Sequence, residues 1–136
     1  MHKHTIAILG TAAILLAGAS DAPAQDLNLN RTAKSGADSP LAYSGRWDRN
    51  CNALPVTVTI TQKPLNGTAT VVDAERVIPQ DTPGSGDTGK CAGKTITSKR
   101  IIYRSNPNFR GNDMVVYETK DGGRLINRTT ISVSVQ

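Results

Sequence analysis

The sequence predicts an all-β fold, a two-sheet sandwich of about seven short strands with one disulfide. Three observations predict it. Residues 55–61 alternate strictly between valine or isoleucine and threonine, turn residues recur about every ten positions, and no helical periodicity of useful length follows residue 25. Alternation with period two is typical of strands with one buried face, and short strands at regular spacing are typical of sandwiches.

The first 24 residues are expected to be a secretory signal peptide. Lys3 stands between two histidines, an apolar run covers residues 5–19, and an Ala-Pro-Ala triplet at 22–24 offers small residues for cleavage before Gln25. This order of basic start, short apolar segment and small-residue exit is the signature of such peptides. A membrane anchor is the alternative, but the run is short and is broken by glycine. We therefore expect a periplasmic or secreted product that does not insert into a membrane.

The remaining chain is long enough for one domain, which we place at residues 45–136. Residues 25–44 are rich in Asn, Ser, Ala, Gly and Asp and contain few large apolar residues. Such a composition cannot bury enough surface to fold by itself. We predict a flexible leader there, with at most one added edge strand near residues 41–43.

The expected strands of the domain follow from alternation and from the turn residues between them. They cover residues 55–61, 68–72 (continued by 74–78 or followed by it as a separate strand), 95–105, 113–119 and 124–136. Asn66-Gly67 is interpreted as a turn with positive φ. Residues 79–93 are dominated by Pro, Gly, Ser and Asp, which predicts a long loop that needs a function or a tether.

Cys51 and Cys91 are the two cysteines of the chain. In the oxidising compartment that export implies, an even pair usually forms a disulfide. A reactive thiol or half of a metal site is the weaker alternative, because a thiolate needs a base beside it and a metal needs more ligands. We expect a bridge that tethers the loop at residues 79–93.

The charge balance is mildly basic. The formal net charge is +5, and 15 basic and 10 acidic residues remain once the signal peptide is removed. A basic excess favours acidic partners, but these residues are scattered among Asp and Glu, as on an ordinary solvated surface. Nucleic acid is excluded as the partner of an exported protein.

Histidine is absent from the mature chain, because His2 and His4 both lie in the signal peptide. This removes Ser-His-Asp and Cys-His catalysis and zinc sites that contain histidine. We predict a protein that is not an enzyme and has no metal or cofactor. A carboxylate-based hydrolase is the residual enzymatic alternative. Its candidate acids, which show no motif spacing, are Asp48, Asp73, Glu75, Asp81, Asp87, Asp113, Glu118 and Asp121.

Two segments resemble bacterial cadherin-like and Ig-like repeat domains. Residues 64–71 read PLNGTATV, and residues 107–117 read PNFRGNDMVVY; a DGG hairpin and a valine-rich last strand follow. The resemblance covers about residues 54–136 and implies an Ig-like (cadherin-like) β-sandwich. The acidic clusters that bind calcium in cadherins are absent, so no calcium dependence is expected.

A binding or adhesion role is the function that these features favour. In the strand at 95–105, alternation places Ser98, Arg100, Ile102 and Arg104 on one face, opposite Ile101 and Tyr103, and Arg110 lies in the following loop. The arginines Arg100, Arg104 and Arg110 are therefore the candidate binding residues, for an acidic glycan of the cell envelope or the extracellular space. The alternative is an inhibitor or assembly accessory that presents the tethered loop to a partner protein.

Overall fold

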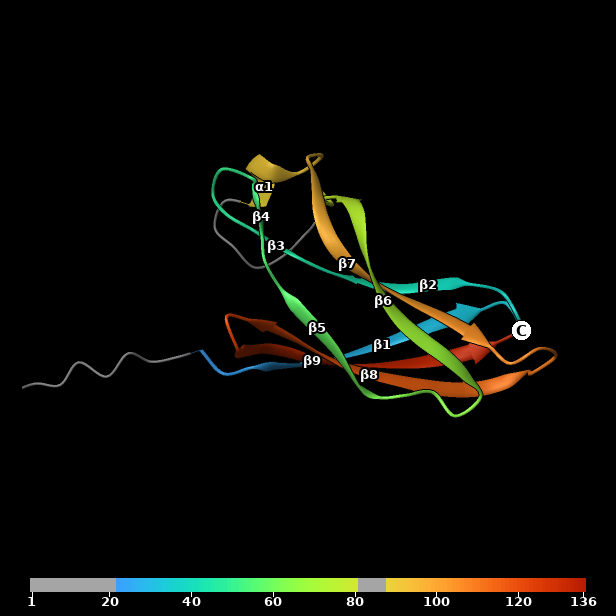
Figure 1. The fold of residues 1–136 in the computed structure, drawn as a ribbon. Helices are drawn as coiled ribbons and strands as arrows, with labels where there is room; N and C mark the ends of the chain where they lie inside the picture. The colour runs from blue at the N-terminus through green and yellow to red at the C-terminus, as the bar shows by residue number, and fades with distance from the viewer. Residues whose placement is uncertain (1–21, 81–87) are drawn as a thin grey trace, which may run out of the picture.

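The computed structural model describes residues 22–80 and 88–136, in which nine strands and one short helix form. Most of the predicted signal peptide and residues 81–87 of the predicted loop lie outside the described residues. The strands build two facing sheets and a small lobe at one end (Figure 1). The predicted all-β sandwich is confirmed.

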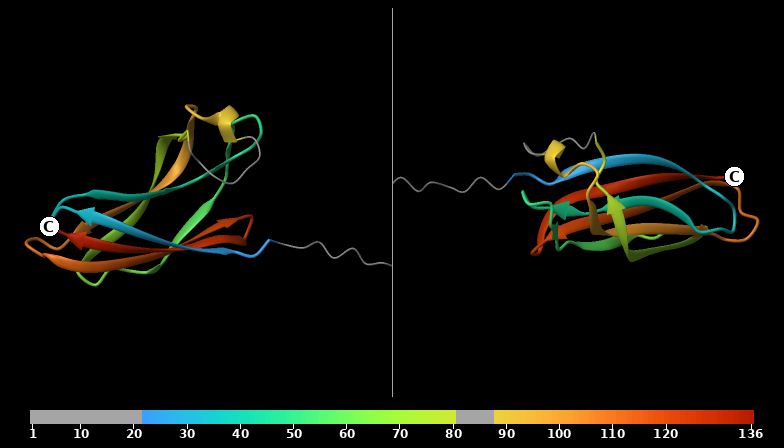
Figure 2. Two further views of the ribbon diagram at one scale, coloured as in Figure 1. Left: turned by 180° about the vertical axis from the view of Figure 1, so that it is seen from behind. Right: turned by 90° about the horizontal axis from the view of Figure 1, so that it is seen from above.

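Sheet A has four strands in the order β1-β9-β8-β5, and sheet B has three in the order β2-β7-β6. The strands of sheet A are β1 (Gln25–Ala33), β5 (Thr57–Gln62), β8 (Gly111–Asp121) and β9 (Arg124–Val135). Those of sheet B are β2 (Ser39–Ser44), β6 (Gly67–Val77) and β7 (Thr95–Ser105). The lobe contains β3 (Arg46–Trp47), β4 (Ala53–Leu54) and α1 (Thr88–Cys91). The two sheets lie close at the end near the C-terminus and separate toward the lobe (Figure 2).

The main core fills the space between the two sheets. Its buried residues are Ala33, Leu41, Ala42, Ile101, Tyr103, Val115, Tyr117, Ile131, Val133 and Val135. Ile101 and Tyr103, predicted on the face of β7 opposite Arg104, are buried, and Arg104 is exposed. Burying a large apolar side chain stabilises the fold by about 1.5–3 kcal/mol, so this layer provides most of the driving force.

The predicted flexible leader at residues 25–44 is wrong, because both of its halves are strands. β1 pairs in parallel with β9 over its whole length, and β2 pairs with β7. Ala33 and Leu41 are buried in the main core. The composition of β1 is polar because most of its side chains are exposed. The strand is held by backbone hydrogen bonds to β9, which do not depend on side-chain type, so composition does not indicate them. The predicted edge strand near residues 41–43 is confirmed as β2.

Gly67 is required for a different reason from the predicted one. β5 and β6 belong to different sheets, so the segment between them is a crossover and not a hairpin turn. Gly67 is not among the glycines with positive φ. A Cβ atom built on it would lie 2.3 Å from the carbonyl oxygen of Arg104. The residue is glycine because β6 starts with its backbone pressed against β7.

The carboxylate of Asp113, at the start of β8, joins the two sheets. It is 8% exposed and accepts hydrogen bonds from the amides of Leu65 (2.9 Å) and Asn66 (3.0 Å) in the crossover. The hydroxyl of Tyr103, on β7 of the other sheet, donates to the same carboxylate at 2.9 Å. Burial and this hydrogen bond raise the pKa of Tyr103 above its ordinary value. Asp113 is thus a structural residue.

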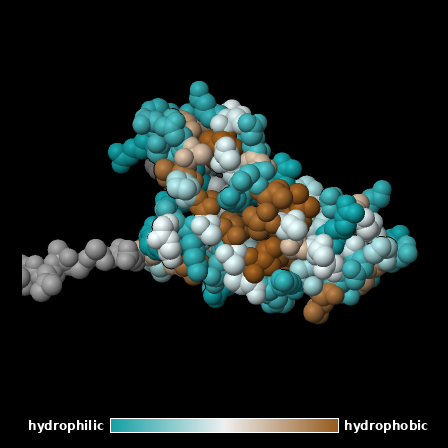
Figure 3. Space-filling view, in the orientation of Figure 1, coloured by the Kyte–Doolittle hydropathy of each residue, from teal (hydrophilic) through white to brown (hydrophobic). Residues whose placement is uncertain are grey.

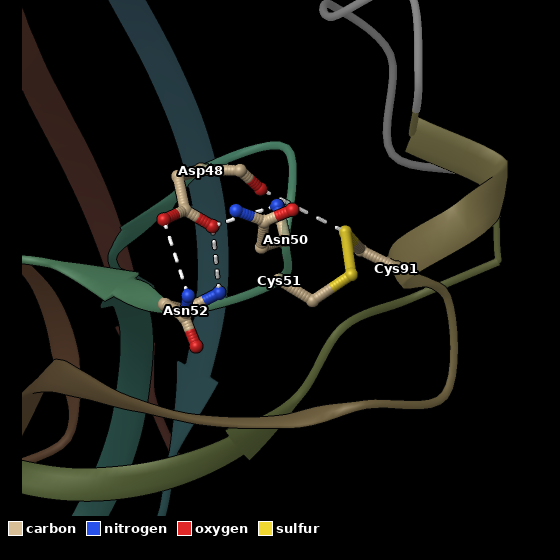
Figure 4. The surroundings of a disulfide bond; sticks show 5 residues. All are labelled: Asp48, Asn50, Cys51, Asn52 and Cys91. Atoms are coloured by element: carbon tan, nitrogen blue, oxygen red, sulfur yellow. Dashed lines mark hydrogen bonds between the residues drawn. A yellow bond between two sulfur atoms is a disulfide. The ribbon is translucent and has the colours of Figure 1, made fainter.

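The lobe has a small core of its own, made by Ile78, Cys91 and Ile96 with Trp47 and Cys51 packed against it. The predicted disulfide is confirmed: Cys51 and Cys91 are bridged, with their Cα atoms 5.3 Å apart. The bridge joins α1 to the β3–β4 hairpin (Figure 4). Part of the predicted loop is therefore helical, at Thr88–Cys91.

The hairpin beside the disulfide is held by Asp48. One carboxylate oxygen accepts the amides of Asn50 (2.8 Å) and Asn52 (2.9 Å), as Figure 4 shows. These bonds, led by that of Asn52, lower the pKa of Asp48. Cys91 Sγ lies 3.9 Å from the Asp48 carbonyl oxygen, which is a contact only, because a disulfide sulfur has no proton to donate.

Candidate functional site

Two arginines and one tyrosine gather on the outer face of sheet B. Tyr43 on β2 lies opposite Arg100 on β7, and Arg76 comes from β6. The guanidinium carbon of Arg100 lies 5.0 Å from the centroid of the Tyr43 ring, and that of Arg76 lies 5.5 Å from the same centroid. We call these three residues the Tyr43 cluster.

Strand alternation brings the cluster to one face. In the β6–β7 ladder, Val72 lies opposite Arg100 and Arg76 lies opposite Ile96, so these side chains share the face that points away from the main core. Ile96 is buried in the core of the lobe. The exposed part of this face therefore starts beyond Ile96, at the Tyr43 cluster, where the residue Tyr43 is 37% exposed.

Neither Arg76 nor Arg100 forms an ion pair with a described residue. The five ion pairs of the described chain join Arg46 with Asp121, Lys99 with Asp73, Arg104 with Asp38, and Lys120 and Arg128 with Glu118. Stacking on an aromatic ring stabilises an exposed guanidinium by about 0.5–1 kcal/mol and fixes its position, but it leaves the positive charge in place. The cluster is thus a fixed double positive charge without an anion among the described residues.

One hydrogen-bond donor of the cluster also lacks a partner among the described residues. Arg100 Nε is buried and has no hydrogen-bond partner within residues 22–80 and 88–136. A guanidinium carries five donors in a planar fork that matches carboxylate, sulfate and phosphate groups. Two such forks beside one ring can hold an anion between them.

The structure does not bring the three predicted binding arginines together. Only Arg100 belongs to the Tyr43 cluster. Arg104 lies on the same face of β7, but its Nε donates to Asp38 at 2.7 Å, which raises the pKa of Arg104 and lowers that of Asp38. Arg110 is exposed on the loop that leads into β8 of sheet A. Ser98, predicted on the same face as Arg100, is buried and donates to the Ala74 carbonyl.

Sequence reasoning missed Tyr43 and Arg76. Tyr43 lies in the segment predicted to be a leader, and the sequence does not decide whether residues 74–78, which include Arg76, continue the preceding strand or form a separate one. Pairing residues 67–77 with residues 95–105 as neighbouring strands would have placed Arg76 on the face of Arg100. The alternation of apolar and polar residues in both segments was the evidence for such a pairing.

Most of the candidate carboxylates of the hydrolase alternative have structural partners. Asp48 and Asp113 accept backbone amides, and Asp73, Glu118 and Asp121 form ion pairs. The hydrogen bond from Arg128 lowers the pKa of Glu118. Asp81 and Asp87 lie outside the described residues. Within residues 22–80 and 88–136, no group of three or more His, Cys, Asp or Glu residues lies close enough together to hold a metal ion.

In the described part of the chain no helix has the length and apolar character needed to span a membrane. No family model matches the chain, and no curated protein matches it in sequence. The solution structure of Amebosin resembles it at 15% identity, over 85% of this chain and 100% of that one, with a TM-score of 0.41. A likeness this weak carries no argument about function.

Proposed function

We propose that this chain is an exported, non-enzymatic binding module that contacts an acidic glycan through the Tyr43 cluster. The observation that supports this most is the pair of guanidinium groups held over one exposed ring without a carboxylate partner among the described residues. Such a pair keeps its attraction for an anion, because no residue of the described chain neutralises it.

A glycan suits this site better than a free anion because apolar surface lies beside the charges. Val72 is 38% exposed opposite Arg100, and Ile102 is half-buried two residues further along β7. Sugar rings present C–H faces to such side chains while their carboxylate or sulfate groups meet the guanidinium forks. The predicted export places the protein where acidic envelope and extracellular glycans occur.

The test is the affinity of the mature protein for polygalacturonate, a carboxylate polymer, compared with its methyl ester, which has lost the charge. We expect binding to the acid form only, weakening as salt is raised. Arg76→Gln and Arg100→Gln, which keep most of the side-chain length, should each weaken it about ten-fold or more, as expected for a charge-assisted contact of about 1.5–3 kcal/mol.

Arg104→Gln and Arg110→Gln are the matched controls, because each removes the same charge outside the cluster. Arg104 is already paired with Asp38, and Arg110 lies on the loop that leads into β8 of the other sheet. Equal losses from all four variants would mean that net charge and not the Tyr43 cluster attracts the polymer. The same result would reject the proposed site.

The alternative, an inhibitor or assembly accessory, depends on the lobe. There the disulfide anchors α1 as one element of a surface that a partner protein could contact. A pull-down from periplasmic and culture fractions distinguishes the two: recovery of one protein in a defined ratio, insensitive to Arg100→Gln, would favour this alternative.

A further inference from the structure

Sheet B ends in a long strand with an open edge. β6 has 11 residues, pairs with β7 through an unbroken register, and has no neighbour on its other side within the described residues. Its sequence contains no proline. An edge of this kind presents a row of free backbone donors and acceptors to another strand.

Sheets A and B have three other edges, and two of these carry features that hinder strand addition. β2 contains Pro40 and an irregular register between Pro40 and Ala42. β5 is only 6 residues long and is irregular between Ile60 and Gln62. β1 has no proline and no register shift, but it lies beside β2, to which Arg31 ties it by an Nε hydrogen bond to the Leu41 carbonyl at 2.7 Å. Natural sheets use prolines, bulges, short strands and charged side chains to block edge pairing; β6 lacks the first three and carries charges only at Asp73, Glu75 and Arg76.

Apolar surface lies beside this open edge. Val58 and Ile60 on β5 and Ala69 on β6 are only partly buried although they pack on the main core, and Val71 is half-buried. Figure 3 shows a hydrophobic area in the middle of this side of the molecule, where β5 and β6 pass in Figure 1. On the opposite side Ala33 and Leu41 are fully covered. A strand added to β6 would cover the apolar surface that the sandwich leaves open.

We infer that β6 pairs antiparallel with β6 of a second copy of this chain. In the register centred on Val71, the three charged residues of β6 meet no charge. Asp73 lies opposite Ala69 of the other copy, Glu75 opposite Gly67, and Arg76 opposite Asn66. Like charges directly opposite are destabilising in a sheet, so this strand is compatible with itself. A two-fold axis through Val71 makes the contact isologous and closed, as in most homodimers.

The pairing has a consequence for ligand binding, which rests on the proposed function. A two-fold axis perpendicular to the sheet keeps the outer faces of both copies on one side of a continuous six-stranded sheet. The two β7 strands are then three strand spacings, about 14–15 Å, apart. Both Tyr43 clusters lie on this side, so a long acidic polymer can occupy both and gain avidity, whereas a short oligosaccharide cannot.

The pairing is tested by sedimentation velocity over a wide concentration range, together with hydrogen exchange. We expect a monomer–dimer equilibrium, and slower amide exchange with rising concentration in residues 67–77 only. Thr70→Lys should weaken the dimer about two- to five-fold, because the two introduced lysines become diagonal neighbours across the axis. Thr59→Lys, an exposed position on the edge strand β5, is the matched control and should leave the dimer unchanged.

A monomer at every concentration, or a dimer indifferent to Thr70→Lys, would overturn the inference. Protection of β6 that arises only on adding an extended valine-threonine peptide to a monomer would overturn it too, in favour of a foreign strand. Thr70→Lys also separates the two proposals. It should bind a short acidic oligosaccharide no more weakly than the parent and lose affinity for the long polymer alone.

Discussion

The buried Asp113 carboxylate gives the sharpest prediction for the fold. Asp113→Ala removes the acceptor of three long-range donors: the amides of Leu65 and Asn66 and the hydroxyl of Tyr103, all at 2.9–3.0 Å. A hydrogen bond to a charged group contributes about 1.5–3 kcal/mol. The contributions of the three hydrogen bonds do not add in full, because Leu65 is 90% exposed and the crossover amides can form hydrogen bonds with water in the variant.

The hydroxyl of Tyr103 cannot reach water in this way, because its side chain is 0% exposed. We therefore expect Asp113→Ala to lower the free energy of unfolding by about 3–5 kcal/mol, a large share of the 5–15 kcal/mol of a typical domain. Tyr103→Phe alone should cost about 1–2 kcal/mol. Asp113→Asn should fall between them, since it keeps one acceptor oxygen but loses the charge.

The assay is urea unfolding followed by far-ultraviolet circular dichroism, which reports the sheets. The double variant of Asp113→Ala and Tyr103→Phe should be more stable than the sum of the single losses predicts, by about 1–2 kcal/mol, because the hydroxyl left unpartnered is gone. A loss below 0.5 kcal/mol for Asp113→Ala, or strict additivity in the cycle, would refute the assignment of Asp113 as the tie between the sheets.

The remaining predictions concern the lobe, the tyrosines and Gly67. Replacing both cysteines by serine should cost about 4 kcal/mol in the chain-entropy model for the 40-residue separation. Because Trp47 packs in the lobe, its fluorescence should change at a lower temperature than the circular dichroism of the sheets; coincident transitions would argue against a separate lobe core. Burial raises the pKa of Tyr103 and of Tyr117 above 10.0. The free energy of unfolding should therefore keep its full value below pH 10 and fall above it, because the unfolded chain loses phenolic protons that the folded chain keeps. Tyr103→Phe should reduce that slope in alkaline unfolding titrations. Gly67→Ala should cost about 1–3 kcal/mol, since its Cβ would overlap the Arg104 carbonyl, and a melting temperature equal to the parent's would contradict the close approach.

Local patterns in the sequence were enough to predict much of the sandwich. The strand predicted at residues 95–105 has the bounds of β7, and alternation predicted that Ile101 and Tyr103 share the face opposite Arg100 and Arg104, the face that the structure buries. This works because a strand buried on one face must alternate, and that requirement is visible in a few consecutive residues. The disulfide followed from two cysteines and the expected compartment, a matter of counting and redox chemistry.

Contacts between distant segments were decided only by the tertiary structure. β1 looked like a leader because its stability comes from parallel pairing with β9, about a hundred residues away in sequence. The Asp113 tie joins residues 47 and 48 positions apart, so nothing near Asp113 in sequence indicates its partners. The Tyr43 cluster combines three strands, and only the order β2-β7-β6 determines that Tyr43 and Arg76 flank Arg100. Alternation assigns a side chain to a face of its own strand, but which strands become neighbours is set by the packing of the whole chain.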